Sequence, residues 1–266
     1  MELIEFLDGI LLQDEVKEKV LELIKDNYNE YIKYADLLNV YNKAEETQEK
    51  ISSIYEFDVY NYNLLSIYLL SALNAYKKYK EIGISDEIFF DTMKCFTRFI
   101  NECYIKNGKY YFDRAFWTYR QTRMSIFRIG VFEYEFNNEG WISLHIPSDS
   151  ILSKENIEKS LKKYAEFINI FYPDKVGCDI TCGSWLLSPE LKKYLGEESR
   201  ILLFQKYFEI TSFNQDALDI FEWVFKTTKD TPIVNLKEDT SLQRNLKKAL
   251  LNGEKIGVGY GKMKKM

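Results

Sequence analysis

The spacing of apolar residues changes near Tyr119, and this change constrains the fold more than any other feature of the sequence. Before it, apolar residues recur every three or four positions, as between Phe89 and Cys103, which is the period of an amphipathic helix. After it, runs such as Trp141 to Ile146 alternate apolar and polar residues, which is the period of a strand. We therefore predict an N-terminal helical domain over residues 1–120 and an α/β (α+β) domain over residues 121–266.

Residues that break helices are scarce, with 12 Gly and 4 Pro in 266 residues, which favours long helices over a turn-rich all-β fold. Apolar residues make up 46% of the chain, which is enough to form a large core and excludes general disorder. In the first domain the spacing predicts two short helices over residues 3–24, a buried helix over 58–79, and a helix that begins after Ser85 and ends at Asn107-Gly108.

The second domain is predicted to mix strands and helices. A hairpin is expected from strands at 127–136 and 141–146, joined by the turn cluster 137–140. Ser153 is the expected cap of a helix over 154–171, and an apolar strand-like run follows over 176–187. Further on we expect a helix from Ser188-Pro189, a strand within 201–210, a helix or strand within 216–225, a capping box at Thr240 to Gln243 and a short strand over 255–260.

Charge and hydropathy exclude two classes of partner. The formal net charge is −5 at pH 7, so the overall charge does not attract the phosphate backbone of nucleic acid. The longest uncharged stretch, residues 59–76, contains five Asn and Ser residues that would be costly in lipid, so we expect a buried helix there and no membrane span.

The cysteines and the first residues indicate the compartment. The chain opens with acidic residues, Met1-Glu2-Leu3-Ile4-Glu5, and not with the basic segment of a signal peptide. We therefore expect a cytoplasmic protein whose four cysteines are free thiols. No metal site is predicted, because the chain has one histidine and its cysteines lack the spacing of zinc motifs.

His145 is that one histidine, and it is a candidate general base. Alternation in residues 142–146 places Ser143 and His145 on the face opposite the apolar residues. An unperturbed imidazole titrates near pH 6.5, which suits proton transfer at neutral pH. Glu133 and Glu135 are expected to bring at least one carboxylate near it. The alternative is a surface or hydrogen-bonded strand histidine, with the carboxylates on a solvated face.

A second candidate group lies in the apolar run 176–187. Cys182, Gly183, Ser184 and Trp185 are adjacent there and could line a ligand groove, with a thiol or hydroxyl as the proton donor to a leaving group. Gly183 within such a run indicates either a bulge or a close approach to the strand backbone. The alternative is that the cysteine is a small buried hydrophobe and the tryptophan is core packing.

Five short motifs, in one order, carry a resemblance that covers nearly the whole chain. It is firmest from residue 120 onward. Together these motifs resemble the bacterial acyltransferase-domain proteins that pair an N-terminal helical domain with a GNAT-like C-terminal domain. The motifs are Arg128 to Glu135, Leu144 to Pro147, Cys182 to Pro189, Phe204-Gln205 and Thr240 to Arg244.

The resemblance implies a GNAT-like mixed-sheet acyltransferase domain over residues 121–266, in which two neighbouring parallel strands separate and an acyl thioester lies in the gap. It implies acyl transfer from acyl-CoA, acetyl-CoA or another acyl thioester to an amine-bearing acceptor. If 176–187 is the separating strand, a helix beginning at Ser188 would present its N-terminus to a pyrophosphate. The residues expected to bind the co-substrate are Gly183, Trp185, Leu186, Leu187 and Ser188.

The same resemblance implies roles for single residues. His145 would be the base, with Glu133 assisting, and Cys182 or Ser184 would donate a proton or a hydrogen bond. Trp185 would form a wall of the acyl pocket. In the family the position of Gly183 is often histidine, which leaves His145 as the candidate base in this chain.

The chain also departs from the family at its phosphate loop, and the departure supports a second hypothesis. Most GNAT enzymes have an Arg/Gln-x-x-Gly-x-Gly/Ala loop, whereas residues 187–190 of this chain read Leu-Ser-Pro-Glu. The alternative function is therefore a non-catalytic GNAT-like module that binds an acyl ligand or a protein partner.

Overall fold

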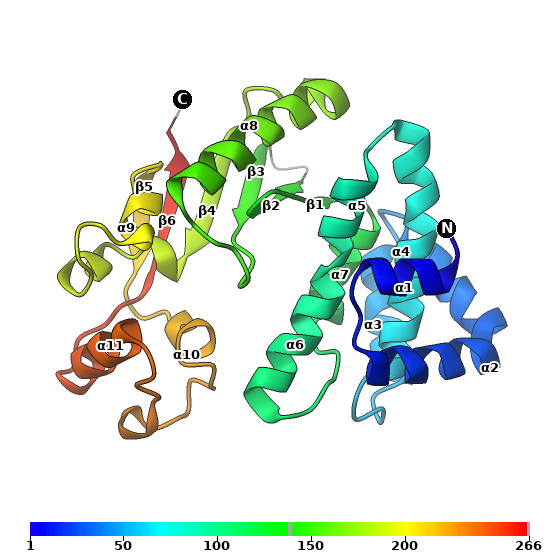
Figure 1. Ribbon diagram of the computed structural model, residues 1–266, viewed down its shortest axis with the longest axis horizontal. Coiled ribbons are helices and arrows are strands. Elements are labelled where there is room, and N and C mark those ends of the chain that lie inside the picture. The colour runs from blue at the N-terminus through cyan, green and yellow to red at the C-terminus, as the bar shows by residue number, and fades with distance from the viewer. Residues whose placement is uncertain (138–139, 265–266) are drawn as a thin grey trace. The chain divides into compact units, whose positions relative to one another are not determined.

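The computed structural model describes residues 1–137 and 140–264, and the chain divides into two compact units (Figure 1). The first unit is Met1–Ile129 and the second is Gly130–Met266. The domain bounds predicted from the sequence, 1–120 and 121–266, stay a prediction. The structure nevertheless changes from helices to strands close to the point at which the apolar spacing changes, because the first strand begins at Ile126.

The first unit is built from helices up to its last residues. Within residues 1–122, all of which the structure describes, every regular element is a helix. The helices are α1 (Leu3–Gly9), α2 (Asp14–Leu38), α3 (Ala44–Ile54), α4 (Tyr62–Ile82), α5 (Asp86–Met93), α6 (Cys95–Asn107) and α7 (Ala115–Thr122), and β1 (Ile126–Ile129) ends the unit.

Helix α4 is the centre of this unit, as its dense apolar sequence predicts. The side chains from Leu64 to Ala72 are all buried, including those of Ser66 and Ser71. Tyr68 extends from α4 toward α7, where its hydroxyl donates a hydrogen bond to the carbonyl of Ala115 at 2.8 Å. Because α4 is buried on all sides, its serines do not indicate a solvent-exposed face.

Two helix predictions in this unit were wrong in their limits. The second short helix is the first part of α2, which continues to Leu38 with a non-helical residue at Asn27. The helix expected from Ser85 to Gly108 is divided at Lys94 into α5 and α6. Its predicted signals are present, because Ser85 caps α5 and Gly108, in the left-handed conformation, ends α6.

The second unit is a mixed sheet with helices. Its strands lie in the order β2-β3-β4-β6-β5, with β3 and β4 parallel and the other pairs antiparallel. The strands are β2 (Phe132–Phe136), β3 (Trp141–His145), β4 (Asp179–Ser184), β5 (Phe208–Asn214) and β6 (Val258–Met263). The helices are α8 (Lys154–Phe171), α9 (Arg200–Gln205), α10 (Asp219–Trp223) and α11 (Ser241–Leu251), with 3-10 turns η1 (Pro173–Lys175), η2 (Trp185–Leu187), η3 (Pro189–Lys193) and η4 (Ile233–Asn235).

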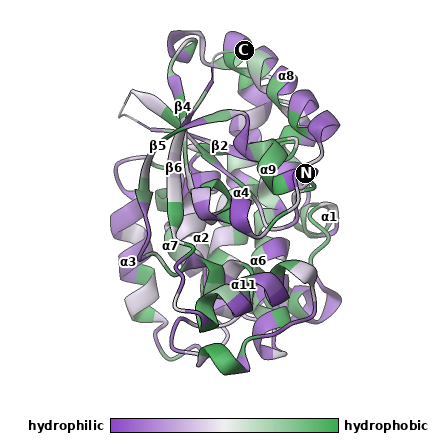
Figure 2. Cartoon of the chain, turned by 90° about the vertical axis from the view of Figure 1, so that its left-hand side faces the viewer, coloured by the Kyte–Doolittle hydropathy of each residue, from purple (hydrophilic) through white to green (hydrophobic). Residues whose placement is uncertain are grey.

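Helix α8 covers one face of this sheet (Figure 1). Tyr134 of β2 stacks on Tyr164 of α8 with ring centroids 4.1 Å apart, and Phe136 contacts Phe167. Ile142 and Leu144 of β3 are opposite Phe136 and Tyr134 in register, and both are buried. Figure 2 shows both hydrophobic and hydrophilic residues along α8, as an amphipathic helix on a sheet requires.

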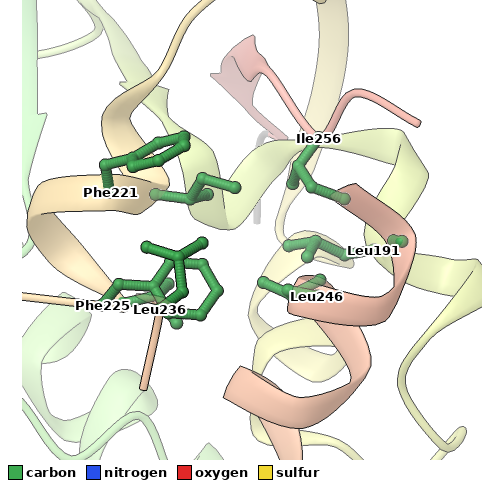
Figure 3. Packing of buried hydrophobic residues seen from close by; sticks show 9 residues of the cluster. Leu191, Phe221, Phe225, Leu236, Leu246 and Ile256 are labelled. Carbon is green, nitrogen blue, oxygen red and sulfur yellow. The ribbon is translucent and has the colours of Figure 1, made fainter. Parts of the chain in front are cut away.

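A separate apolar cluster holds the chain segments around β5 and β6 together (Figure 3). It joins Leu191 of η3 to residues of α10 and α11, and Trp185 packs against it. The capping box predicted at Thr240 begins α11: Thr240 and Gln243 exchange hydrogen bonds between side chain and backbone. The buried members are Leu191, Ile220, Phe221, Val224, Phe225, Leu236, Leu246, Ala249 and Ile256.

Several strand limits in the second unit differ from the prediction. The run 127–136 is two strands, because Gly130 has a φ of +67° and turns the chain between them. Residues 201–210 are mostly α9, and β5 begins only at Phe208. The segment after Ser188 is a five-residue 3-10 turn and not the expected α-helix.

We expect Gly130→Ala to destabilise the second unit more than a matched glycine substitution does. A Cβ at Gly130 would lie 2.9 Å from the Cβ of Ser160 on α8, in addition to the strain of its positive φ. The strain costs about 1–2 kcal/mol and overpacking about 1–3 kcal/mol.

Gly253→Ala is the control, because Gly253 has a φ of +79° and a Cβ there would meet no atom within 4 Å. Chemical denaturation should show a larger loss of unfolding free energy for Gly130→Ala. Equal losses would show that the contact with Ser160 adds nothing.

Candidate active site

A histidine and a carboxylate lie together on the face of the sheet opposite α8. Glu133 and Glu135 of β2 are in register with His145 and Ser143 of β3, so these four side chains share that face. The Nε2 atom of His145 lies 3.0 Å from Oε2 of Glu135. The prediction that Ser143 and His145 lie opposite the apolar residues of β3 is confirmed.

This contact favours one tautomer of the neutral imidazole. A carboxylate only accepts hydrogen bonds, so the ring nitrogen that faces Glu135 carries a proton. In the neutral ring the lone pair then belongs to Nδ1, which is the atom that can accept a proton. The side chains of His145 and Glu135 are 28% and 13% exposed, so the pair is reachable from solvent.

Glu133 lies directly across from His145 in register and is more deeply buried, with 2% of its surface exposed. From the sequence, at least one of the two carboxylates was expected near the histidine, and the resemblance implied Glu133 as the assisting group. Glu135 contacts the imidazole, and the assisting role of Glu133 stays a prediction.

His145 is the last residue of β3 and lies two residues beyond the last position at which β3 pairs with the parallel strand β4. Ile142 pairs with Ile180 and Ser143 with Thr181, and these are the last registered positions of β3 and β4. Beyond them β4 continues to Ser184 in register with β6. Ligands of open α/β sheets bind beyond the carboxyl ends of parallel strands, which is where His145 lies.

The helix that follows β3 begins at the same end of the sheet. The crossover from β3 to parallel β4 runs through α8, so the N-terminus of α8 follows the carboxyl end of β3. Ser153 caps it by accepting from the backbone N–H of Asn156 at 3.2 Å. This 18-residue helix, and not the 3-10 turn after Ser188, is the long helix beside the site. The helix dipole there favours an anion.

Cys182 is directed to the other side of the sheet from His145. It follows Ile180 by two positions on β4 and therefore shares the apolar face with Ile142. It is 3% exposed, and burial raises the pKa of its thiol to about 12. The structure does not bring Cys182 and His145 together on one face.

Gly183 is exposed on the same face as His145 and is covered by a neighbouring ring. Tyr260 of β6 is its register partner, and a Cβ on Gly183 would lie 2.7 Å from Cε1 of that ring. The strand has no register shift here, so of the two explanations offered by the sequence, close approach is the correct one. The shift in this sheet lies in β5, between Ile210 and Ser212.

Residues 184–188 form a corner held by the chain's own polar groups. Ser184 accepts from the N–H of Leu186 at 3.1 Å, and the side-chain amide of Gln205 donates to the carbonyls of Leu186 and Ser188 at 2.9 Å each. Leu187 and Ser188 are fully buried, and the Ser188 hydroxyl donates to the carbonyl of Ile256. The roles predicted for Ser184, Trp185 and Leu186 to Ser188 stay predictions.

Three further findings concern the whole described chain. All four cysteines are free. Over residues 1–137 and 140–264, no three His, Cys, Asp or Glu side chains gather as a metal site would require. None of the described helices combines the length and apolar character needed to cross a membrane.

Comparison with known proteins assigns the family. A model described as the GNAT-like C-terminal domain matches residues 105–263, which is more than half of the chain. The chain belongs to this GNAT-like family. A second model, described as the N-acyltransferase N-terminal domain, matches residues 1–124. No curated protein sequence gives a significant match.

Solved acyltransferases share the fold. The crystal structure of an acyltransferase in complex with decanoyl-CoA and teicoplanin is 22% identical, with a TM-score of 0.69, and the match covers 76% of this chain but 65% of that one. An acyltransferase in complex with decanoyl-CoA is 18% identical, with a TM-score of 0.70, and here the match covers 98% of this chain and 82% of that one. The GNAT-like mixed α/β fold with a helical N-terminal region is thereby confirmed.

The cysteine environments predict a simple pattern of thiol reactivity. A thiol with a pKa near 12 is only about 10⁻⁴ thiolate at pH 8, so Cys182 should react very slowly. Burial also raises the pKa of Cys103 to about 12, and Cys95 is buried. Cys178 is half-buried. We expect one fast-reacting thiol per folded chain with a disulfide reagent, and four after denaturation.

Cys178→Ser should remove the fast reaction. A fast thiol that survives in this variant would mean that Cys182 or another buried cysteine is activated.

Proposed function

We propose that this GNAT-like protein transfers an acyl group from acyl-CoA to an amine acceptor. The observation that supports this most is the His145–Glu135 pair at the carboxyl end of the parallel strands β3 and β4. The imidazole is oriented by a carboxylate and lies just beyond the paired part of the two strands. A base in this position could accept the proton of an amine that attacks a thioester.

The donor is an acyl-CoA in this proposal, with its pyrophosphate at the N-terminus of α8. Solved neighbours of the same fold are complexes with decanoyl-CoA, which supports this class of donor. The segment 146–153 between β3 and α8 then takes the place that the sequence had assigned to Ser188. A helix of 18 residues has the dipole and the N–H groups that an anion needs, whereas a 3-10 turn of five residues does not.

The reaction follows from the state of the imidazole. A neutral amine attacks the thioester carbonyl and forms the new C–N bond, while Nδ1 of His145 accepts the proton that the nitrogen loses. The tetrahedral intermediate then collapses, the C–S bond breaks, and the thiolate leaves with the bonding electron pair. The thiolate takes up the proton that the imidazolium of His145 gives up, directly or through water, and the products are an amide, a free thiol and the neutral imidazole.

Glu135 would act on the base and not on the substrate. Its carboxylate holds Nε2–H, so the ring keeps Nδ1 toward the acceptor and gains stabilisation when it becomes an imidazolium. Glu133, directly across from His145, adds negative charge to the same face. Both carboxylates also attract an ammonium-bearing acceptor before it loses its proton.

The remaining assignments are part of the same proposal. Ser184 shares a face of β4 with Cys182, and it is favoured over Cys182 as hydrogen-bond donor to the thiolate because it is half-buried, whereas Cys182 is 3% exposed. Trp185 would be a wall of the acyl pocket. The reducing cytoplasm, inferred from the four free cysteines, is the expected place of action.

We expect His145→Ala to lose turnover and to keep its fold. Removing a general base lowers kcat by about 10²–10⁴-fold, whereas a half-exposed strand residue contributes little to stability, about 1 kcal/mol or less. Release of thiol from decanoyl-CoA with an amine acceptor measures kcat, and a thermal-shift assay measures binding of decanoyl-CoA. Glu135→Gln should lower kcat less, because the base remains.

Glu209→Gln is the matched control. Glu209 of β5 is an exposed carboxylate in register with Lys262, away from His145, and its loss should leave kcat unchanged. Wild-type turnover in His145→Ala would refute the assignment of the base. Binding of decanoyl-CoA without any turnover in the wild type would favour the non-catalytic binding module.

A further inference from the structure

We propose that Tyr260 is a positioning residue for the amine acceptor and that Gly183 is needed to make room for its ring. This inference rests on the proposed acyl transfer and adds the side of the sheet from which the acceptor approaches. Tyr260 belongs to β6, far in sequence from every residue that the sequence analysis assigned to the site.

Alternation places His145, Gly183 and Tyr260 on one face of the sheet. Ser143 and Thr181 are the last paired residues of β3 and β4, and His145 and Gly183 each lie two positions beyond them on that face. Gly183 in turn pairs with Tyr260 across the antiparallel ladder, where β4 and β6 lie side by side (Figure 1). Side chains from the carboxylate of Glu133 to the ring of Tyr260 therefore form a row on this face, which is interrupted between His145 and Gly183 because β3 and β4 are no longer paired there.

The glycine is needed because the ring occupies the space above it. A Cβ on Gly183 would lie 2.7 Å from Cε1 and 2.8 Å from Cδ1 of Tyr260. Any side chain at this position must therefore displace the ring. The tyrosine is nevertheless 44% exposed, so the ring leans over β4 and still presents a surface to solvent.

The chemistry of the row suits an amine. Carboxylates attract an ammonium group, and the face of an aromatic ring attracts it as well, by cation–π interaction. The row has carboxylates on one side of His145 and the tyrosine ring on the other. An amine bound between them has the imidazole within the same row, and Gly183 leaves room for the ring of Tyr260 over the backbone of β4.

The test compares Michaelis constants for the two substrates. With decanoyl-CoA as donor and glucosamine, spermidine and lysine methyl ester as amines, Tyr260→Ala should raise the KM for the amine at least tenfold. The KM for decanoyl-CoA should change less than twofold. Tyr260→Phe should stay close to wild type, because it keeps the ring.

Gly183→Ala supplies a second, independent measurement. By displacing the ring it should raise the amine KM in the wild-type background but not further in the Tyr260→Ala background. Gly196→Ala is the control, because a Cβ at Gly196 would meet no atom within 4 Å and its φ is not in the left-handed region. Thermal melting should confirm that every variant is folded.

The outcomes separate this inference from the function on which it rests. If the wild type transfers decanoyl groups and Tyr260→Ala has the wild-type amine KM, the positioning role is wrong and the acyltransferase proposal stands. Equal rises in both Michaelis constants would also overturn the positioning role, because they indicate a general structural effect. A wild-type protein that acylates none of the three amines overturns both proposals.

Discussion

The packing of α8 on the sheet is the interaction on which the candidate site depends. Tyr134 stacks on Tyr164, and Ile142 and Leu144 are buried on the same face. Because side chains alternate along a strand, this burial forces the odd-numbered residues of β2 and β3 to the other face, and a slip of one residue would exchange the two sets. Burial of Ile142 and Leu144 in the hydrophobic core is therefore sufficient to place the side chain of His145 on the opposite face of the sheet.

One βαβ unit then supplies both parts of the proposed chemistry. Strand β3 ends at the imidazole, and the helix that follows begins at the same end of the sheet with a capped, electropositive N-terminus. In the proposed function, residues 141–156 would thus contain both the base for the amine and the site for the anionic part of the thioester. Strand β4, returning parallel to β3, carries Gly183 on the same face as His145, and Tyr260 of β6 pairs with Gly183.

Patterns that act over short distances could be predicted from the sequence. The helix over 154–171, the antiparallel pairing of β2 with β3 and the capping box at Thr240 follow from local spacing and caps, and all are present, although the predicted turn 137–140 lies partly outside the described residues. The face of the sheet on which His145 lies could be predicted from the alternation of apolar and polar residues alone. Pairings between distant segments could not be derived in this way. The contact of Tyr260 with Gly183 joins residues 77 positions apart, and the contact of Glu135 with His145 depends on side-chain direction across two strands. The start of α8 at Ser153 was predicted, whereas Ser188-Pro189-Glu190 has the local signals of a helix start and begins a 3-10 turn.

Hydrogen exchange with and without decanoyl-CoA tests most directly the claim that the thioester binds at the β3–α8 junction. The account predicts that the ligand slows exchange of backbone amides within residues 144–156, at the end of β3 and the first turn of α8. Protection confined to residues 188–193, or to the helices of the first unit, with none in 144–156, would contradict it.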